Sequence, residues 1–138
     1  MGRQAKHLYI NLPVKHVKES KVFFEQLGFD FQEQLTNDQA ACLVIGDTIT
    51  VMLLSHKHFQ TISEKQLVDA RQASEVIISM QVDSRKEVDE LVEQAMAAGG
   101  SPFKEKQDHG FMYGWSFQDL DGHLWEVFYM DEERSGLS

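Results

Sequence analysis

The chain has 138 residues, a formal net charge of −9 and a hydrophobic content of 42%. This length suits one well-buried domain, and the negative charge disfavours nucleic acid and anionic membranes as partners. No apolar run approaches the roughly 20 residues that a membrane-spanning helix needs, and the apolar stretch near the N-terminus is too short for a signal peptide. The lone cysteine, Cys42, cannot form an internal disulfide and fits a reducing compartment. We therefore expect a cytoplasmic protein whose partner is a small molecule or another protein.

The first half of the chain carries the signals of one helix among four strands. Phe23 and Leu27 lie one helical turn apart, and Gly28 is suited to a left-handed helix end. The dipeptides "ND" and "GD" are turn signals that separate antiparallel neighbours. The predicted elements are a strand at 7–12, a helix at 20–27, and strands at 29–36, 40–45 and 48–55.

A second strand–helix–strands series follows a polar segment. Ser63 and Gln66 have capping-box spacing, which predicts a helix at 63–74, whereas His56 and His58 are expected in an extended surface loop. Ser84 and Glu87 form a second capping box. The predicted elements are a strand at 76–82, a helix from 85 to the Gly99-Gly100 pair, and strands at 103–106, 111–117 and 123–129.

The order βαβββ thus occurs twice, and alignment of Val14 with Val82 superposes the two strand–helix openings. We predict an α+β fold in which two βαβββ modules form a curled mixed sheet around a cavity. The predicted single domain, 1–138, consists of module one at 7–55, a linker at 56–75 and module two at 76–130. The cavity is the natural ligand site.

Two segments carry a family resemblance: "INLPVKHVKESKVFFEQLGF" near the start and "QDHGFMYGWSFQDLDGHLWEVFYMD" near the end. The chain resembles the vicinal oxygen chelate superfamily, which comprises glyoxalases, fosfomycin- and bleomycin-resistance proteins and extradiol dioxygenases. The ending "DGHLWEV" is similar to that of predicted lactoylglutathione lyases. The resemblance implies the fold above, a homodimer, and, in the metalloenzymes, a divalent ion held by His, Glu or Gln from the first and last strands of each module.

Glu126 stands at the last-strand position of module two and is the candidate catalytic residue if the protein is an enzyme. The other three positions carry Tyr9, Leu53 and Ile77, which cannot complete a divalent site. We therefore expect no metal or other cofactor. A shift of two residues along two strands would instead bring His7, Glu75 and Glu126 together, so a divalent metal stays an alternative.

The same alternation of side chains extends the candidate ligand site. Leu124 and Phe128 share the face of Glu126, and Tyr9 and Asn11 share the cavity side of the first strand. His109 could border the pocket as a base or donor, although an acid–His–Gly triplet is more often a turn. Core packing is the alternative for Tyr9 and Asn11, and a structural hydrogen bond for Glu126. The predicted ligand-binding residues are Tyr9, Asn11, Leu53, Ile77, His109, Tyr113 and Glu126.

Three functions follow from this reading. The first is a metal-free protein that binds a small, partly apolar molecule in the sheet cavity. The second is a divalent-metal-dependent lyase or dioxygenase of the lactoylglutathione lyase type. The third is a non-catalytic structural or regulatory dimer whose cavity is vestigial.

Overall fold

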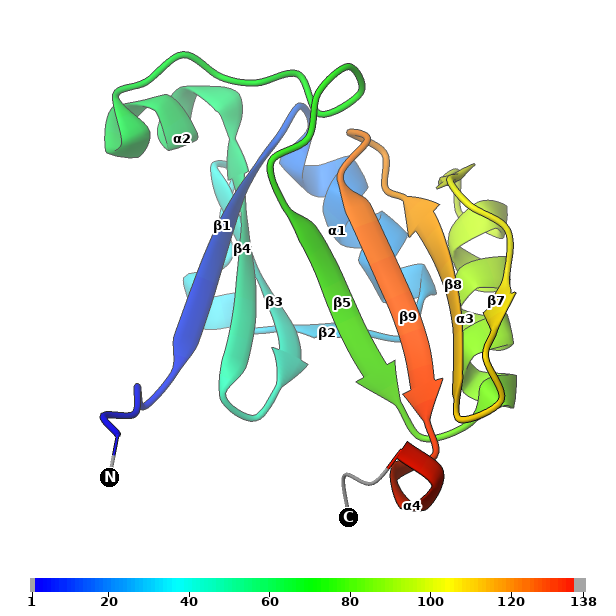
Figure 1. The fold of residues 1–138 in the computed structure, drawn as a ribbon. Coiled ribbons are helices and arrows are strands. Elements are labelled where there is room, and N and C mark those ends of the chain that lie inside the picture. The colour runs from blue at the N-terminus through cyan, green and yellow to red at the C-terminus, as the bar shows by residue number, and fades with distance from the viewer. Residues whose placement is uncertain (1, 136–138) are drawn as a thin grey trace. The chain divides into compact units, whose positions relative to one another are not determined.

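The computed structural model describes residues 2–135 and divides into two compact units between Leu67 and Val68 (Figure 1). Each unit contains a strand, a helix and then further strands, so the predicted α+β class and the βαβββ repeat are confirmed. Val14 ends the first strand of one unit and Val82 ends the first strand of the other, as their alignment in the sequence predicted.

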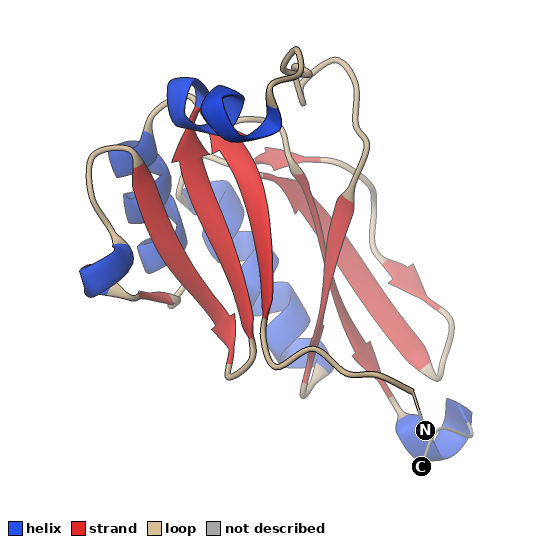
Figure 2. Cartoon of the chain, turned by 90° about the vertical axis from the view of Figure 1, so that its left-hand side faces the viewer, coloured by secondary structure: helices blue, strands red, loops and turns tan. Residues whose placement is uncertain are grey.

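The first unit contains a four-stranded mixed sheet whose strands lie side by side in the order β1-β4-β3-β2 (Figure 2). The pair β1 and β4 is parallel, and the other neighbours are antiparallel. Its elements are β1 (Leu8–Val14), α1 (Val17–Gln26), β2 (Asp30–Phe31), the 3-10 turn η1 (Glu33–Leu35), β3 (Ala40–Gly46), β4 (Ile49–Ser55) and α2 (His56–Ser63).

The core of this unit is built between α1 and the sheet. Helix α1 packs against β3 and β4. Phe23 and Phe24 of the helix and Leu43 and Leu53 of the strands are at most 1% exposed. Gly28 follows the helix at φ +92°, a left-handed conformation that a glycine adopts at little cost, as predicted for the helix end.

The second unit repeats this plan with a five-stranded sheet. The strand order is β5-β9-β8-β6, β7 also pairs with β8, and β5 runs parallel to β9. Its elements are β5 (Ile77–Val82), α3 (Arg85–Ala97), β6 (Ser101–Pro102), β7 (Gln107–Asp108), β8 (Met112–Gln118), β9 (Leu124–Met130) and α4 (Glu132–Ser135).

Helix α3 begins where the capping box predicted. The Ser84 hydroxyl accepts the Glu87 N–H at 3.0 Å, and the Glu87 carboxylate accepts the Asp83 N–H at 3.2 Å. The helix then buries one apolar face against β8 and β9. The buried residues of that face are Val88, Leu91, Val92 and Ala95.

The predicted helix at 63–74 is wrong, because the helix between the modules lies earlier, at His56–Ser63. Ser55, the last residue of β4, caps this helix by accepting the His58 N–H at 3.2 Å. Glu64 then ends it in the left-handed conformation at φ 58°. The prediction of His56 and His58 in an extended loop is therefore also wrong, since residues two apart on a helix do not face the same side.

Two predicted strands are mostly replaced by turns. Segment 29–36 contributes only β2 and then turns through η1, where the Thr36 hydroxyl donates to the Gln32 carbonyl at 2.9 Å. Segment 103–106 lies between β6 and β7 without strand pairing. There, the Lys104 N–H donates to the Ser116 hydroxyl at 3.3 Å, a side-chain contact in place of a ladder hydrogen bond.

Candidate functional site

The sheet of the second unit has two chemically different faces. Ser79 on β5 and Ser116 on β8 both pair with Glu126 on β9, so these three side chains share one face. Leu124 and Phe128 lie on the same face because side chains alternate along a strand, as their parity predicted. We call this surface the Glu126 face. The opposite face packs against α3.

Glu126 is exposed, and its Oε1 accepts a hydrogen bond from the Ser79 hydroxyl at 2.9 Å. The carboxylate is therefore on the solvent side of the strand rather than buried within it. Among the side chains that the structure describes, no Lys, Arg or His forms an ion pair with Glu126. A hydroxyl donor holds the carboxylate while its charge remains available to a ligand.

The other strand residues of the Glu126 face are uncharged, and at one end of the face Gln81 donates to the Glu132 carboxylate of α4 at 3.1 Å. Ile77 is 58% exposed, and Leu124 and Phe128 are half-buried. The register places the following residues of β5, β8 and β9 on this face: Ile77, Ser79, Gln81, Met112, Gly114, Ser116, Gln118, Leu124, Glu126, Phe128 and Met130. Glu126 is therefore the one charged residue that the described parts of β5, β8 and β9 place on this face.

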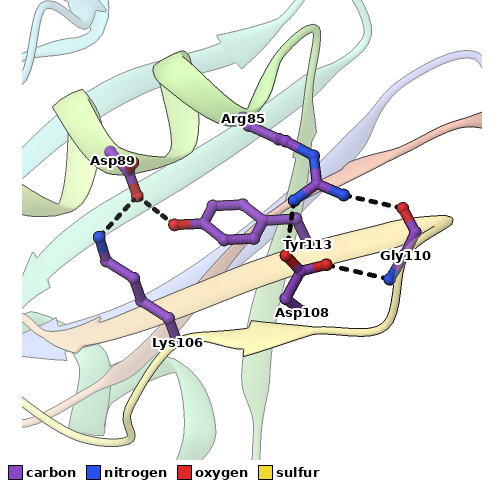
Figure 3. A network of polar contacts seen from close by, with 6 residues as sticks. All are labelled: Arg85, Asp89, Lys106, Asp108, Gly110 and Tyr113. Carbon is purple, nitrogen blue, oxygen red and sulfur yellow. Dashed lines mark hydrogen bonds and ion pairs between the residues drawn. The ribbon is translucent and has the colours of Figure 1, made fainter.

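Tyr113 lies on the opposite face of this sheet, so it does not border the same surface as Glu126. It pairs with Tyr129, whereas Glu126 pairs with Ser116. Because Tyr113 and Glu126 lie on opposite faces of the sheet, they cannot both border a pocket on one of these faces. This corrects the sequence interpretation, which placed both residues in one ligand site. The phenol is 9% exposed and donates to the Asp89 carboxylate of α3 at 2.6 Å (Figure 3). Burial raises the pKa of Tyr113, and the hydrogen bond to Asp89 raises it further.

His109 is exposed and lies in a turn, which agrees with the alternative interpretation of the acid–His–Gly triplet. The Asp108 carboxylate accepts the Gly110 N–H at 3.0 Å within that turn. Arg85 of α3 donates to Asp108 at 2.9 Å and to the Gly110 carbonyl at 2.8 Å. The Arg85 hydrogen bond lowers the pKa of the Asp108 carboxyl below its usual value. These contacts fix the turn against α3.

In the first unit, Tyr9 and Asn11 share a sheet face and are both exposed. Leu53 lies on the opposite face, because it pairs with Leu12, whereas Asn11 pairs with Met52. Leu53 is fully buried in the core. The sequence interpretation placed Leu53 on the cavity side of the sheet, but the strand register places it on the opposite face. A shift of one residue moves a side chain to the other face of a sheet.

The donor atoms at the four family positions do not fit a divalent ion. Leu53 and Ile77 carry no ligating atom, which leaves a phenol from Tyr9 and one carboxylate from Glu126. Within residues 2–135, no group of three or more His, Cys, Asp or Glu residues is arranged to hold a metal ion. The residues present therefore do not match the metal site of the metalloenzymes.

The alternative metal set combines residues of both units and stays a prediction. The His7 ring nitrogen Nε2 lies 2.7 Å from the Thr50 hydroxyl oxygen, and the ring stacks on Tyr9 with 4.4 Å between centroids. Glu75 is exposed in the loop before β5. Ser79 is not among the residues predicted from the sequence, although it lies two residues after Ile77 and so faces the same side. Its spacing of two residues from Ile77 is the sequence signal that would have identified it.

The family profile of the Glyoxalase/Bleomycin resistance protein/Dioxygenase superfamily matches residues 6–127. The chain belongs to this superfamily. None of the curated proteins compared with the chain matches it. No helix within residues 2–135 is both long enough and apolar enough to cross a bilayer.

Solved structures share the fold of this superfamily member. A hypothetical protein from S. aureus is 33% identical, with a TM-score of 0.79 over 92% of this chain and 95% of that one. A glyoxalase-related enzyme from Fulvimarina pelagi is 20% identical, with a TM-score of 0.76 over 88% and 85%. A bleomycin resistance determinant encoded on the transposon Tn5 is 18% identical, with a TM-score of 0.64 over 92% and 99%.

Proposed function

We propose that this member of the superfamily binds a small, partly apolar molecule at the Glu126 face and does so without a metal ion. The observation that carries the proposal is the Glu126 carboxylate, which is exposed and held by Ser79 among uncharged strand residues. Glu126 acts as a binding group. We also propose that the protein works in the cytoplasm as a homodimer.

The charge of the site favours one class of ligand. A carboxylate accepts hydrogen bonds and attracts cations, whereas a second anion beside Glu126 is repelled. The net charge of −9 adds to this preference at long range. Ile77, Leu124 and Phe128 offer apolar contact beside the carboxylate. The expected ligand carries a cationic or hydrogen-bond-donating group next to an apolar or aromatic group.

The donor set supports binding without a metal. Leu53 and Ile77 offer no ligating atom at the family positions, and the Glu126 carboxylate alone lacks the ligand number that divalent ions take in proteins. The name of the Tn5 relative associates it with bleomycin resistance, and this suggests metal-free bleomycin as one probe. A smaller probe pair of matched shape is phenethylammonium and phenylacetate, which carry opposite charges on an aromatic ring.

Isothermal titration with these probes tests the proposal. Phenethylammonium or bleomycin should bind the intact chain, and Glu126→Gln should weaken the binding by about tenfold or more, since it removes a charge-assisted contact. Ser79→Ala should weaken it by less, and Glu93→Gln, a change of an exposed carboxylate on α3, should not alter it. Binding of phenylacetate with equal affinity, or unchanged binding in Glu126→Gln, would refute the proposed site.

Elemental analysis separates this function from its two alternatives. The purified protein is analysed for stoichiometric Ni, Zn, Mn or Fe. If such a metal is present, if a chelator removes it and if Glu126→Ala no longer binds it, a metal-dependent lyase or dioxygenase is favoured over a metal-free binding protein. If neither metal nor any cationic or neutral probe raises the melting temperature, the structural or regulatory dimer is favoured.

A further inference from the structure

The α3 side of the second unit contains a lysine whose side chain is 45% exposed and whose ammonium group lies beside three different groups. The Nζ atom of Lys106 lies 3.3 Å from the Asp89 carboxylate and 4.6 Å from the centroid of the Trp115 ring. A hydrogen bond with Asp89 raises the pKa of Lys106, and a hydrogen bond with Tyr113 acts in the same direction. Lys106 is therefore held as a cation between a carboxylate, a phenol and an indole.

These three groups are the ones that recognise an alkylammonium ion. A carboxylate supplies the opposite charge, and an indole face attracts a cation through its quadrupole. The Tyr113 hydroxyl donates its proton to Asp89 at 2.6 Å, so its oxygen remains an acceptor for an ammonium N–H (Figure 3). An aromatic ring, a phenol oxygen and a carboxylate thus converge on one cation.

The host groups and the lysine come from different parts of the second unit. Asp89 belongs to α3, and Tyr113 and Trp115 belong to β8, the strand that pairs with β9. Arg85 stacks on Tyr113 at 5.0 Å from the ring centroid and fixes it from α3. Lys106 belongs to segment 103–109, which β7, the Arg85–Asp108 contact and the Lys104 N–H hold in place, but its own side chain is 45% exposed.

We propose that Asp89, Tyr113 and Trp115 form a binding site for a primary alkylammonium group, and that Lys106 is its internal ligand. The site lies on the α3 side of the sheet and does not depend on the function proposed for the Glu126 face. An external amine, such as the side chain of a lysine on a partner or a free alkylamine, takes the place of the Lys106 ammonium group when the exposed Lys106 side chain turns toward solvent.

The tether makes Lys106 a strong competitor. A group linked by a short chain acts at an effective concentration in the millimolar range, so an external amine must exceed that level in the intact chain. Removal of the Lys106 side chain leaves Asp89 and the Trp115 ring without their cation. The variant Lys106→Ala should therefore bind external alkylammonium ions more tightly than the intact chain.

Chemical rescue provides the test. Lys106→Ala should melt a few degrees lower than the intact chain, and n-butylammonium chloride at tens of millimolar should restore at least half of this loss, relative to an equal concentration of NaCl. Lys104→Ala is the matched control, since Lys104 lies in the same segment over Phe103 and not over Trp115. Butylammonium should not stabilise that variant or Lys106→Ala combined with Asp89→Asn.

A second readout does not depend on the melting temperature. The indole N–H of Trp115 should shift in the NMR spectrum when butylammonium is added to Lys106→Ala, whereas that of Trp125, which is fully buried, should stay in place. The shift should persist when Glu126→Gln is added, which keeps this result separate from the Glu126 face. Equal effects of butylammonium and NaCl, or a Trp115 signal that does not move, would overturn the proposal.

Discussion

The carboxylate of Asp119 accepts the indole N–H of Trp125 at 3.0 Å, and both side chains are buried. The same carboxylate accepts the backbone N–H groups of Asp121 and His123, each at 3.0 Å. One side chain thus fixes the turn between β8 and β9 and also orients the largest residue of the core. Burial raises the pKa of Asp119 in spite of these hydrogen bonds.

Removal of this carboxylate should destabilise the second unit. Asp119→Ala leaves three donors without their acceptor, and we expect a loss of roughly 3 kcal/mol in the free energy of unfolding. Asp119→Asn keeps one acceptor oxygen and should lose about half as much. Urea denaturation followed by Trp fluorescence measures both variants. Equal stability of Asp119→Ala and the intact chain would contradict the structural role of the turn.

Gly122→Ala should destabilise the folded protein for two reasons. Gly122 has φ +90°, and a Cβ atom there would lie 2.8 Å from Arg71 Cγ and 3.0 Å from the Arg71 backbone nitrogen. We expect a loss of about 2 kcal/mol or more. Gly46→Ala is the control, because its Cβ would meet no atom within 4 Å. Thermal unfolding of the two variants should separate them clearly, and a similar melting temperature for both would argue against the close approach of Arg71.

Leu53 and Ile77, the two apolar residues at family metal positions, should respond differently to truncation. Leu53 is fully buried, so Leu53→Ala should cost roughly 2–5 kcal/mol through lost burial and a cavity. Ile77 is 58% exposed, so Ile77→Ala should change the stability by less than about 1 kcal/mol. Denaturant midpoints measure the difference. Ile77→Ala should instead weaken the binding of phenethylammonium. A loss of stability as large as that of Leu53→Ala would contradict the exposed position of Ile77.

The Asp108 carboxyl should titrate below its usual pKa of 3.8, mainly because Arg85 donates a hydrogen bond to it. A lowered pKa means that the contact stabilises the folded state above the unfolded pKa, and that this stabilisation is lost as the pH falls through the lower, folded value. The affected range therefore lies below about pH 4. An NMR titration of the carboxyl carbon should show the pKa moving up toward 3.8 in Arg85→Gln. Lys86→Gln, a neighbouring change on α3, should leave it unaltered.

The sequence predicted elements well where local signals and burial agree. The capping box at Ser84 is one such signal, and alternating strands such as β9 are another. The helix expected at 63–74 failed because Ser63 offered a plausible cap, whereas Ser55 at the end of β4 provides the actual one. Capping spacing alone does not choose between two serines, since a helix also needs surroundings that favour it.

The candidate site depended on strand register, which the sequence does not fix. Parity within one strand correctly grouped Leu124, Glu126 and Phe128. Parity between strands was not available, so Leu53 and Tyr113 were placed on faces opposite to those that they occupy. The Lys106 contacts also lay beyond sequence reasoning, because they join α3, β8 and an irregular segment.

The parallel pairing of β5 with β9 has a consequence for synthesis of the chain. Among the residues that the structure describes, β5 lies at the edge of its sheet and pairs with β9 alone. On the ribosome, Ile77–Val82 emerges early and must wait until Leu124–Met130 has been translated before it can form its hydrogen bonds. During that interval the nascent chain exposes an unpaired strand rich in β-branched residues, and this makes the time before β9 arrives the stage of synthesis most prone to aggregation.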